Sequence, residues 1–279
     1  MQKEYELSGK PGNIYIIGIL VGSVVMFLCQ YVYLLVNIAA PSFFYKLAVY
    51  GASLYLLFWV QKLVSRTGKC RGRTHAVICG FILGFIAVYL NMAIFAFLVI
   101  SDTDDSEGLF VLLMHPGKIA ELFQFFLTVA RYHEEYAFNR GYLELILVTE
   151  YAGIVIASAY GGSRALEEQV FCENCNQWAE KHTIENRLES PDSGQLNGII
   201  WEDASSLTEL KTADSDHPYQ LQLHLFHCGK CSGLHAMDID LVFCEPGANG
   251  LLVKQKEDAG PIMLIEEPVY QRILAHAGA

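Results

Sequence analysis

Positive charge is scarce in this chain. Among its 279 residues, 19 are Lys or Arg and 30 are Asp or Glu, which gives a formal net charge of −11. The imbalance lies in residues 164–279, with 8 basic and 19 acidic residues, whereas residues 1–163 hold 11 of each. Nucleic-acid binding relies on a basic surface that displaces counterions from phosphates. The sequence therefore argues against a nucleic-acid partner, and the acidic part suits a basic protein partner or simply solubility.

Recognisable catalytic motifs are also missing. The chain has no Gly-rich phosphate loop and no Gly-x-Ser-x-Gly nucleophile turn. The run His133-Glu134-Glu135 lacks the spacing of the His-Glu-x-x-His metal motif. An enzyme is therefore less favoured than a protein without catalytic activity.

Long stretches carry almost no charge. A helix needs roughly 20 apolar residues to cross a bilayer, and four segments in this chain meet that length approximately. They predict a four-span transmembrane domain over residues 1–163 and a separate soluble domain over residues 164–279. The four predicted spans are residues 14–36, 43–60, 76–100 and 142–162.

The basic residues of the first domain cluster in one loop, between the second and third predicted spans. Cytoplasmic loops of membrane proteins carry an excess of Lys and Arg. We therefore expect a multi-pass protein of the cell (inner) membrane with both termini in the cytosol. The five basic residues are Lys62, Arg66, Lys69, Arg71 and Arg73.

The segment between the third and fourth spans contains its own helical pattern. Apolar residues recur at helical spacing over residues 117–131, which predicts an amphipathic helix lying along the outer membrane interface. His115 and His133 flank this helix and are candidates for an outer polar or metal site. An ordinary solvated face explains the same two histidines.

Glu150 stands out because it lies inside the fourth predicted span. An acidic residue at such a position costs roughly 2.5–3.5 kcal/mol on insertion scales and faces a partner or a watery cavity. We consider Glu150 a candidate ion or proton site, with a structural hydrogen bond inside the bundle as the alternative. Tyr151, Asn91 and Tyr89 are its expected hydrogen-bond partners.

The second domain contains two Cys-x-x-Cys pairs, Cys172/Cys175 and Cys228/Cys231. Four thiolates in two short-spaced pairs are typical of a closed tetrahedral zinc site, and cytosolic thiols stay reduced. The pattern predicts a structural zinc ion. Redox-active dithiols and a catalytic zinc are less favoured alternatives, and His227 or His235 could replace one cysteine as a ligand.

The residues around the second pair alternate as strands do. Apolar and polar residues alternate over 221–225 and again over 237–243, so strands are expected on both sides of the pair. A further strand is expected at 196–201. Together with the cysteines, residues 171–178 and 221–243 resemble a zinc ribbon, which implies a small β-rich domain organised around zinc. The 52 residues between the pairs exceed the usual 15–20, so an insertion is expected between them.

These features predict an α-helical transmembrane bundle, with four spans and an interfacial helix, followed by a zinc-ribbon-like domain. The soluble domain is expected to act as an interaction or assembly module. Besides the lipid bilayer, its expected partner is another protein or further copies of the chain. The alternative is an oligomeric transport or channel-like protein that uses Glu150 in the membrane.

Overall fold

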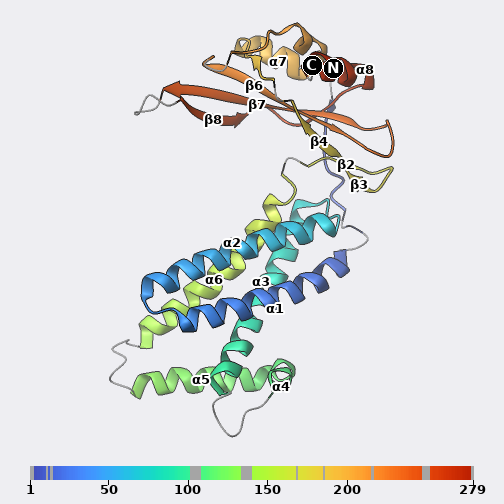
Figure 1. Cartoon of the computed structure of the whole chain (residues 1–279). Coiled ribbons are helices and arrows are strands. Elements are labelled where there is room, and N and C mark those ends of the chain that lie inside the picture. The colour runs from blue at the N-terminus through green and yellow to red at the C-terminus, as the bar shows by residue number, and fades with distance from the viewer. Residues whose placement is uncertain are drawn as a thin grey trace. The chain divides into compact units, whose positions relative to one another are not determined.

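The computed structural model divides into two compact units (Figure 1). One unit comprises Ser8–Glu167, and we call it the helical unit; the other joins Met1–Leu7 to Glu168–Ala279, and we call it the sheet unit. The described residues are 3–10, 12, 15–100, 108–132, 140–167, 169–184, 186–214, 217–246 and 252–277.

Four long helices form the helical unit. They are α1 (Tyr15–Ala39), α2 (Phe43–Thr67), α3 (Arg73–Ile100) and α6 (Arg140–Arg164). Helices α1 and α6 each pack against both α2 and α3, so the four form a closed bundle. Among the described residues, all four helices contain a segment long and apolar enough to cross a membrane.

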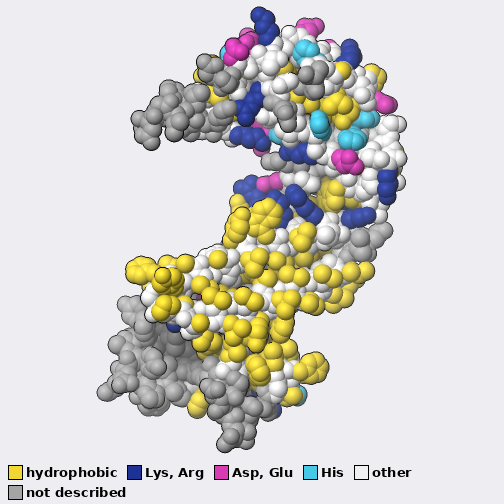
Figure 2. Space-filling view, viewed as in Figure 1, with side chains coloured by type: hydrophobic (Ala, Val, Ile, Leu, Met, Phe, Trp, Pro, Cys, Tyr) yellow, Lys and Arg dark blue, Asp and Glu magenta, His cyan; other side chains and the backbone are white. Residues whose placement is uncertain are grey.

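The outside of this bundle is as apolar as its inside. Large side chains such as Leu20, Phe44 and Phe85 are more than half exposed, and hydrophobic atoms cover most of the described helical surface in Figure 2. Soluble monomers rarely expose continuous apolar patches of this kind. The composition and surface of the four helices therefore suggest a membrane protein.

Two shorter helices follow α3. Helix α4 (Leu109–Met114) ends at His115, and α5 (Pro116–Tyr132) begins at the next residue. Pro116 suits the first position of a helix because its missing N–H needs no partner there. Helix α5 covers residues 117–131, so the helix predicted there is present. Its side chain Ile119 is almost fully buried.

The sheet unit is built on antiparallel strands. The path of the main sheet is β1-β9-β7-β6-β4, with β5 also paired to β6 and β8 to β7; β2 and β3 form a separate two-stranded sheet. The strands are β1 (Lys3–Glu4), β2 (Phe171–Cys172), β3 (Gln177–Trp178), β4 (Glu180–Thr183), β5 (Leu188–Glu189), β6 (Tyr219–His227), β7 (His235–Pro246), β8 (Leu252–Asp258) and β9 (Met263–Leu264).

The two predicted strands around the second cysteine pair are confirmed as β6 and β7. They pair in register from Tyr219 opposite Phe243 to His227 opposite His235. One face of this hairpin carries Leu221, Leu223, Leu225, Met237 and Ile239, all buried in the core of the unit. Helices complete that core: α7 (Ser193–Trp201), the 3-10 helix η1 (Ala204–Glu209) and α8 (Glu267–Ala277).

The strand expected at 196–201 is wrong, because these residues belong to α7. The Asp192 side chain caps this helix by accepting a hydrogen bond from the backbone N–H of Gln195 at 2.8 Å. An Asp at the N-cap satisfies an N–H group that has no partner within the helix. Ile199 and Ile200 then enter the core from a helix and not from a strand.

The first strand was not anticipated from the sequence. Lys3 pairs with Leu264 and Glu4 with Met263, so β1 forms an edge of the main sheet. Tyr5 continues the connection, because its hydroxyl accepts a hydrogen bond from the Phe171 N–H at 2.8 Å. The chain therefore leaves the sheet unit before α1 and returns to it after α6.

Candidate functional site

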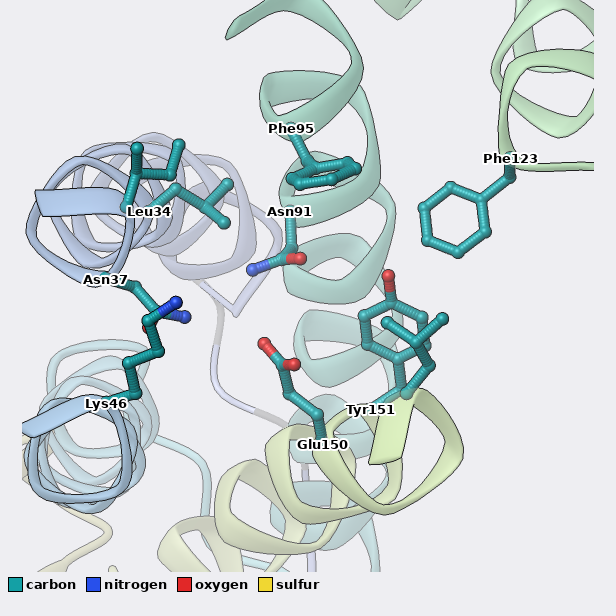
Figure 3. Close-up of a pocket in the computed structure, with 10 residues that line it drawn as sticks. Leu34, Asn37, Lys46, Asn91, Phe95, Phe123, Glu150 and Tyr151 are labelled. Carbon is teal, nitrogen blue, oxygen red and sulfur yellow. The ribbon is translucent and has the colours of Figure 1, made fainter. Parts of the chain in front are cut away.

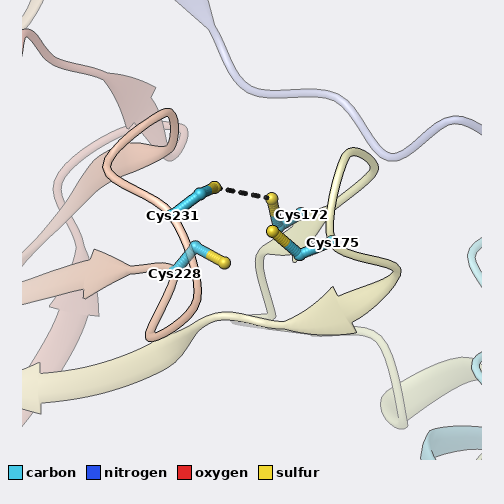
Figure 4. Close-up of side chains that lie close together, drawn as sticks. All are labelled: Cys172, Cys175, Cys228 and Cys231. Atoms are coloured by element: carbon cyan, nitrogen blue, oxygen red, sulfur yellow. Dashed lines mark hydrogen bonds between the residues drawn. The ribbon is translucent and has the colours of Figure 1, made fainter.

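Two loops of the sheet unit bring the four predicted cysteines together. Cys172 ends β2 and Cys175 lies in the turn before β3, whereas Cys228 follows β6 and Cys231 precedes β7. Figure 4 shows the four sulfur atoms directed toward one space between the loops. The long insertion between the pairs therefore does not separate them.

The spacing of the sulfur atoms fits a single ion. All four Sγ atoms lie within 4.8 Å of one another, and those of Cys172 and Cys231 are 3.7 Å apart. Zinc–sulfur bonds of about 2.3 Å in a tetrahedron place the sulfurs roughly 3.8 Å apart. A disulfide needs about 2.05 Å, and all four cysteines are free thiols. The cluster could therefore hold a metal ion.

The second loop favours a thiolate. Burial works to raise the pKa of Cys228, but hydrogen bonds from the backbone N–H groups of Lys230 and Cys231 and from the Cys172 and Cys175 thiols together outweigh it, and the pKa falls to about 6. Burial raises the pKa of Cys172, and the hydrogen bond with Cys231 is the main reason that the pKa of Cys175 is raised. Adjacent thiolates repel one another, so a divalent cation is what would let all four sulfurs lose their protons.

The two histidines near the second pair have other contacts. His227 Nε2 lies 3.6 Å from a carboxylate oxygen of Glu180. The ring of His235 packs against Tyr270, with centroids 4.7 Å apart. Neither belongs to the group of ligand atoms formed by the four cysteines. A site of four thiolates has no open position for a substrate, which makes catalytic zinc chemistry a poor fit.

Glu150 is held by a residue that the sequence did not suggest. Its Oε1 accepts a hydrogen bond of 2.7 Å from the hydroxyl of Tyr33 on α1, and that hydroxyl accepts one from Asn37 Nδ2 at 3.1 Å. Two of the expected partners are engaged elsewhere. Tyr89 donates to the Leu113 carbonyl oxygen and Asn91 to Gln30 Oε1.

A cavity of about 200 Å³ in the helical unit is lined in part by Glu150. Figure 3 shows this carboxyl group, the amides of Asn37 and Asn91 and the amine of Lys46 along the cavity. The remaining lining is apolar or aromatic. It comprises Leu34, Ile38, Phe95, Phe123, Leu147 and Tyr151.

The proposed outer pair of histidines is only partly visible. His115 lies between α4 and α5, and its Nδ1 is 2.8 Å from the Val111 carbonyl oxygen. This contact ties the ring to the preceding helix. His133 lies outside the described residues, so a shared site for the two stays a prediction.

The sequence also gave no indication of a buried polar cluster on the second face of the sheet. His224 Nε2 lies 2.5 Å from Asp240 Oδ2, and Lys256 Nζ contacts the same oxygen at 2.5 Å. Thr183 Oγ1 lies 2.9 Å from His224 Nδ1. The polar positions of the alternating pattern were the available signal, but alternation predicts a solvated face, whereas His224 and Asp240 are buried.

Comparison with known proteins adds no further identification, because no protein-family model, curated protein or solved structure matches this chain.

Proposed function

We propose that this chain is an integral membrane protein whose sheet unit is a zinc-stabilised module that docks a protein partner at the cytosolic face. The cluster of four cysteine sulfurs within 4.8 Å carries this proposal. Zinc is the ion that such thiolate sets typically bind in structural sites. A bound ion would tie the β2–β3 turn to the β6–β7 hairpin, so its binding free energy would stabilise the fold of the module.

Short connections support a module that stays close to the bilayer. Only six residues, 165–170, separate α6 from β2. A fully extended chain spans at most about 3.6 Å per residue, so this connection reaches roughly 21 Å. The ten residues between β1 and α1 form a second connection. A module attached at two points can present a docking surface in a restricted position.

The pairing of β1 with β9 supports placing both ends of the chain on one side of the membrane. Strand β1 precedes α1 and β9 follows α6, yet they share one sheet. An even number of crossings satisfies this pairing, and the four candidate spans give that number. The basic residues at the adjoining ends of α2 and α3 and in the loop between them favour the cytosol as that side.

Charge suggests the chemistry of the partner. Residues 164–279 carry the whole net charge of −11. Opposite charge steers protein association and weakens with salt. A partner with a basic surface, or a second copy that contributes basic residues, fits this module.

Metal analysis of the purified full-length protein tests the module. We expect about one zinc per chain, and we expect Cys172→Ser and Cys228→Ser each to lose it together with thermal stability. Cys244→Ser is the matched control, because Cys244 is buried in β7 outside the cluster. Full zinc retention by both cluster variants would contradict a shared site.

Partner capture tests the docking role. Full-length protein in detergent should retain a stoichiometric protein partner at low salt, and Cys172→Ser should reduce that retention more than Glu150→Gln does. The opposite dependence on the two variants would contradict docking through the sheet unit.

A second function is favoured by the cavity beside Glu150. A carboxyl group at such a position lines a path for ions or small solutes in many membrane proteins. We propose as the alternative that an oligomer of this chain transports or conducts a solute past Glu150. Proteoliposome flux that Glu150→Gln abolishes, and that Cys172→Ser leaves largely intact, is the expected result for this function. Flux unchanged by Glu150→Gln would contradict it.

A further inference from the structure

Two side chains of opposite charge line the cavity of the helical unit. Lys46 reaches it from α2 and Glu150 from α6. Among the ion pairs of the described residues, none joins these two. Lys46 is exposed in the first turn of α2, whereas Glu150 is partly buried in α6. The cavity therefore presents an acid and a base that one bound molecule can pair at the same time.

The Glu150 side of the cavity is rich in hydrogen-bond acceptors. Oε1 of Glu150 is occupied by Tyr33, and no described residue donates to Oε2. Asn37 Oδ1 is buried and has no hydrogen-bond partner among the described residues. The Asn91 amide nitrogen donates to Gln30 at 2.9 Å, and its oxygen points the other way in Figure 3. An ammonium group has three N–H donors and no acceptor, so it matches these oxygens.

The Lys46 side favours an acidic group. Lys46 lies in the first turn of α2, and its backbone N–H bonds to Ser42, which caps the helix. The N-terminal end of a helix carries partial positive charge. The Lys46 ammonium therefore favours an anion, at a different part of the cavity from the Glu150 carboxyl group (Figure 3).

Aromatic rings line another part of the cavity. The ring centroids of Phe95 and Phe123 are 6.3 Å apart, and those of Phe123 and Tyr151 are 6.2 Å apart. Such rings attract ammonium groups and cover apolar carbon atoms. At about 200 Å³ the cavity suits a ligand smaller than the drug-sized molecules that fill pockets of about 300–1,000 Å³.

We propose that this cavity binds a small zwitterion that carries a primary ammonium group and an acidic group. Glu150 and Asn91 accept hydrogen bonds from the ammonium group, and Lys46 pairs with the acidic group at the end of the cavity where Figure 3 also shows the Asn37 amide. A free amino acid and the ethanolamine-phosphate headgroup of a phospholipid share this chemistry. The inference rests on the second function proposed above, because it names a ligand for the same cavity. If the ligand binds but does not cross the membrane, the binding site still stands and only the transport function fails.

Ligand-induced thermal stabilisation of delipidated full-length protein in detergent is the test. The probes are L-valine, isobutylamine, which lacks the acid, and 3-methylbutanoate, which lacks the amine. We expect L-valine to raise the unfolding temperature most and the two single-charge analogues to bind at least about tenfold more weakly, a difference of about 1.4 kcal/mol.

Matched variants assign the two charges. Glu150→Gln should weaken L-valine and isobutylamine together, and Lys46→Gln should weaken L-valine but leave isobutylamine unchanged. Lys62→Gln is the control, because Lys62 lies on the same helix, outside the cavity lining, with its amine over the Trp59 ring. Unfolding without ligand shows that each variant is folded. Binding that is equal in all four proteins would overturn the proposal.

Lipid addition separates the two sources. Phosphatidylethanolamine in mixed micelles should stabilise the protein in a Glu150-dependent manner if the headgroup is the ligand, whereas phosphatidylglycerol, which has no amine, should not. Failure of both L-valine and phosphatidylethanolamine to bind would overturn the inference. Binding without flux in proteoliposomes would instead remove the transport function and keep the site.

Discussion

His224 combines a buried imidazole with charges from three other strands. Asp240 on β7 and Lys256 on β8 contact it, and Lys181 lies on β4, where Thr183 also contacts the ring. Burial is the main cause that lowers the pKa of His224; Lys181 and Lys256 add to this effect, and Asp240 opposes it. The ring is therefore neutral in the folded protein at neutral pH.

This lowered pKa predicts a pH-dependent stability. The unfolded chain takes up a proton near its ordinary pKa of about 6.5, before the folded protein does. Stability is therefore fully present above that pH and is lost as the pH falls, with a slope of at most about 1.4 kcal/mol per pH unit for one proton. Thermal unfolding between about pH 7 and pH 5 should show a shallower slope in His224→Asn than in the parent protein.

Metal loss at low pH also destabilises the module, but it affects the parent and the variant equally, because both keep the four cysteines. His217→Asn serves as the control, since His217 is only half-buried and its ring lies 2.8 Å from the carbonyl oxygen of the nearby Tyr219. An unchanged slope in His224→Asn would show that this ring does not titrate with folding.

At the scale of single residues, the sequence located the chemistry but not the neighbours. The Cys-x-x-Cys spacing identifies ligands because it depends on local geometry, whereas Tyr33 lies 117 positions from its partner Glu150. No periodicity links residues that distant. The buried state of His224 and Asp240 likewise depends on strands β4 and β8, which pack around them in three dimensions.

Helix packing in the bundle depends on small residues at the contacts between elements. A methyl group added at Gly80 would lie 2.5 Å from the Ser158 carbonyl oxygen and 2.6 Å from the Ala159 Cα. These are backbone atoms of α6, which cannot move aside without shifting the helix. Gly80 therefore permits the close approach of α3 and α6 within one chain.

Gly80→Ala should destabilise the bundle. Overpacking of this kind costs about 1–3 kcal/mol, and it should appear as a lower unfolding temperature in detergent. Gly51→Ala in α2 is the matched control, because nothing lies within 4 Å of a methyl group placed there. Equal unfolding temperatures for the two variants would contradict tight packing at Gly80.

At the scale of elements, continuous apolar runs were sufficient to find the long helices. Helix α2 continues from Phe43 to Thr67, past the predicted end of the apolar segment at residue 60, because hydrogen bonding and helix propensity do not stop where hydropathy does. Helix α7 was missed because Ile199, Ile200 and Trp201 form a short continuous apolar run, which fits a strand as well as a helix. Helix α8 was not anticipated either. Both are stabilised mainly by packing on the sheet.

At the scale of the molecule, the four spans and the shared sheet predict that both termini face the cytosol. Green fluorescent protein fused at either end should be fluorescent, and alkaline phosphatase fused there should be inactive. Phosphatase inserted within residues 101–107, between α3 and α4, should be active. Active phosphatase at the C-terminus would reverse the orientation, and opposite results at the two ends would contradict four crossings.

The two-part organisation was visible from charge and hydropathy, because lipid and water select different compositions. The contribution of the first residues to the second part was not. Strand β1 has two residues, too few for a pattern, and its partner β9 lies about 260 positions away. A local sequence pattern cannot reveal a contact between residues that distant.

The β1–β9 pair also ties maturation to the order of synthesis. Strand β1 leaves the ribosome before every spanning helix, and β9 leaves after all of them. Until β1 pairs with it, the edge of β9 is not covered by another strand, and unpaired strand edges promote aggregation. If an odd number of helices inserted, β1 and β9 would lie on opposite sides of the bilayer, and the two strands could not pair. If all four candidate helices cross the membrane, closure of this edge requires that each of them has inserted.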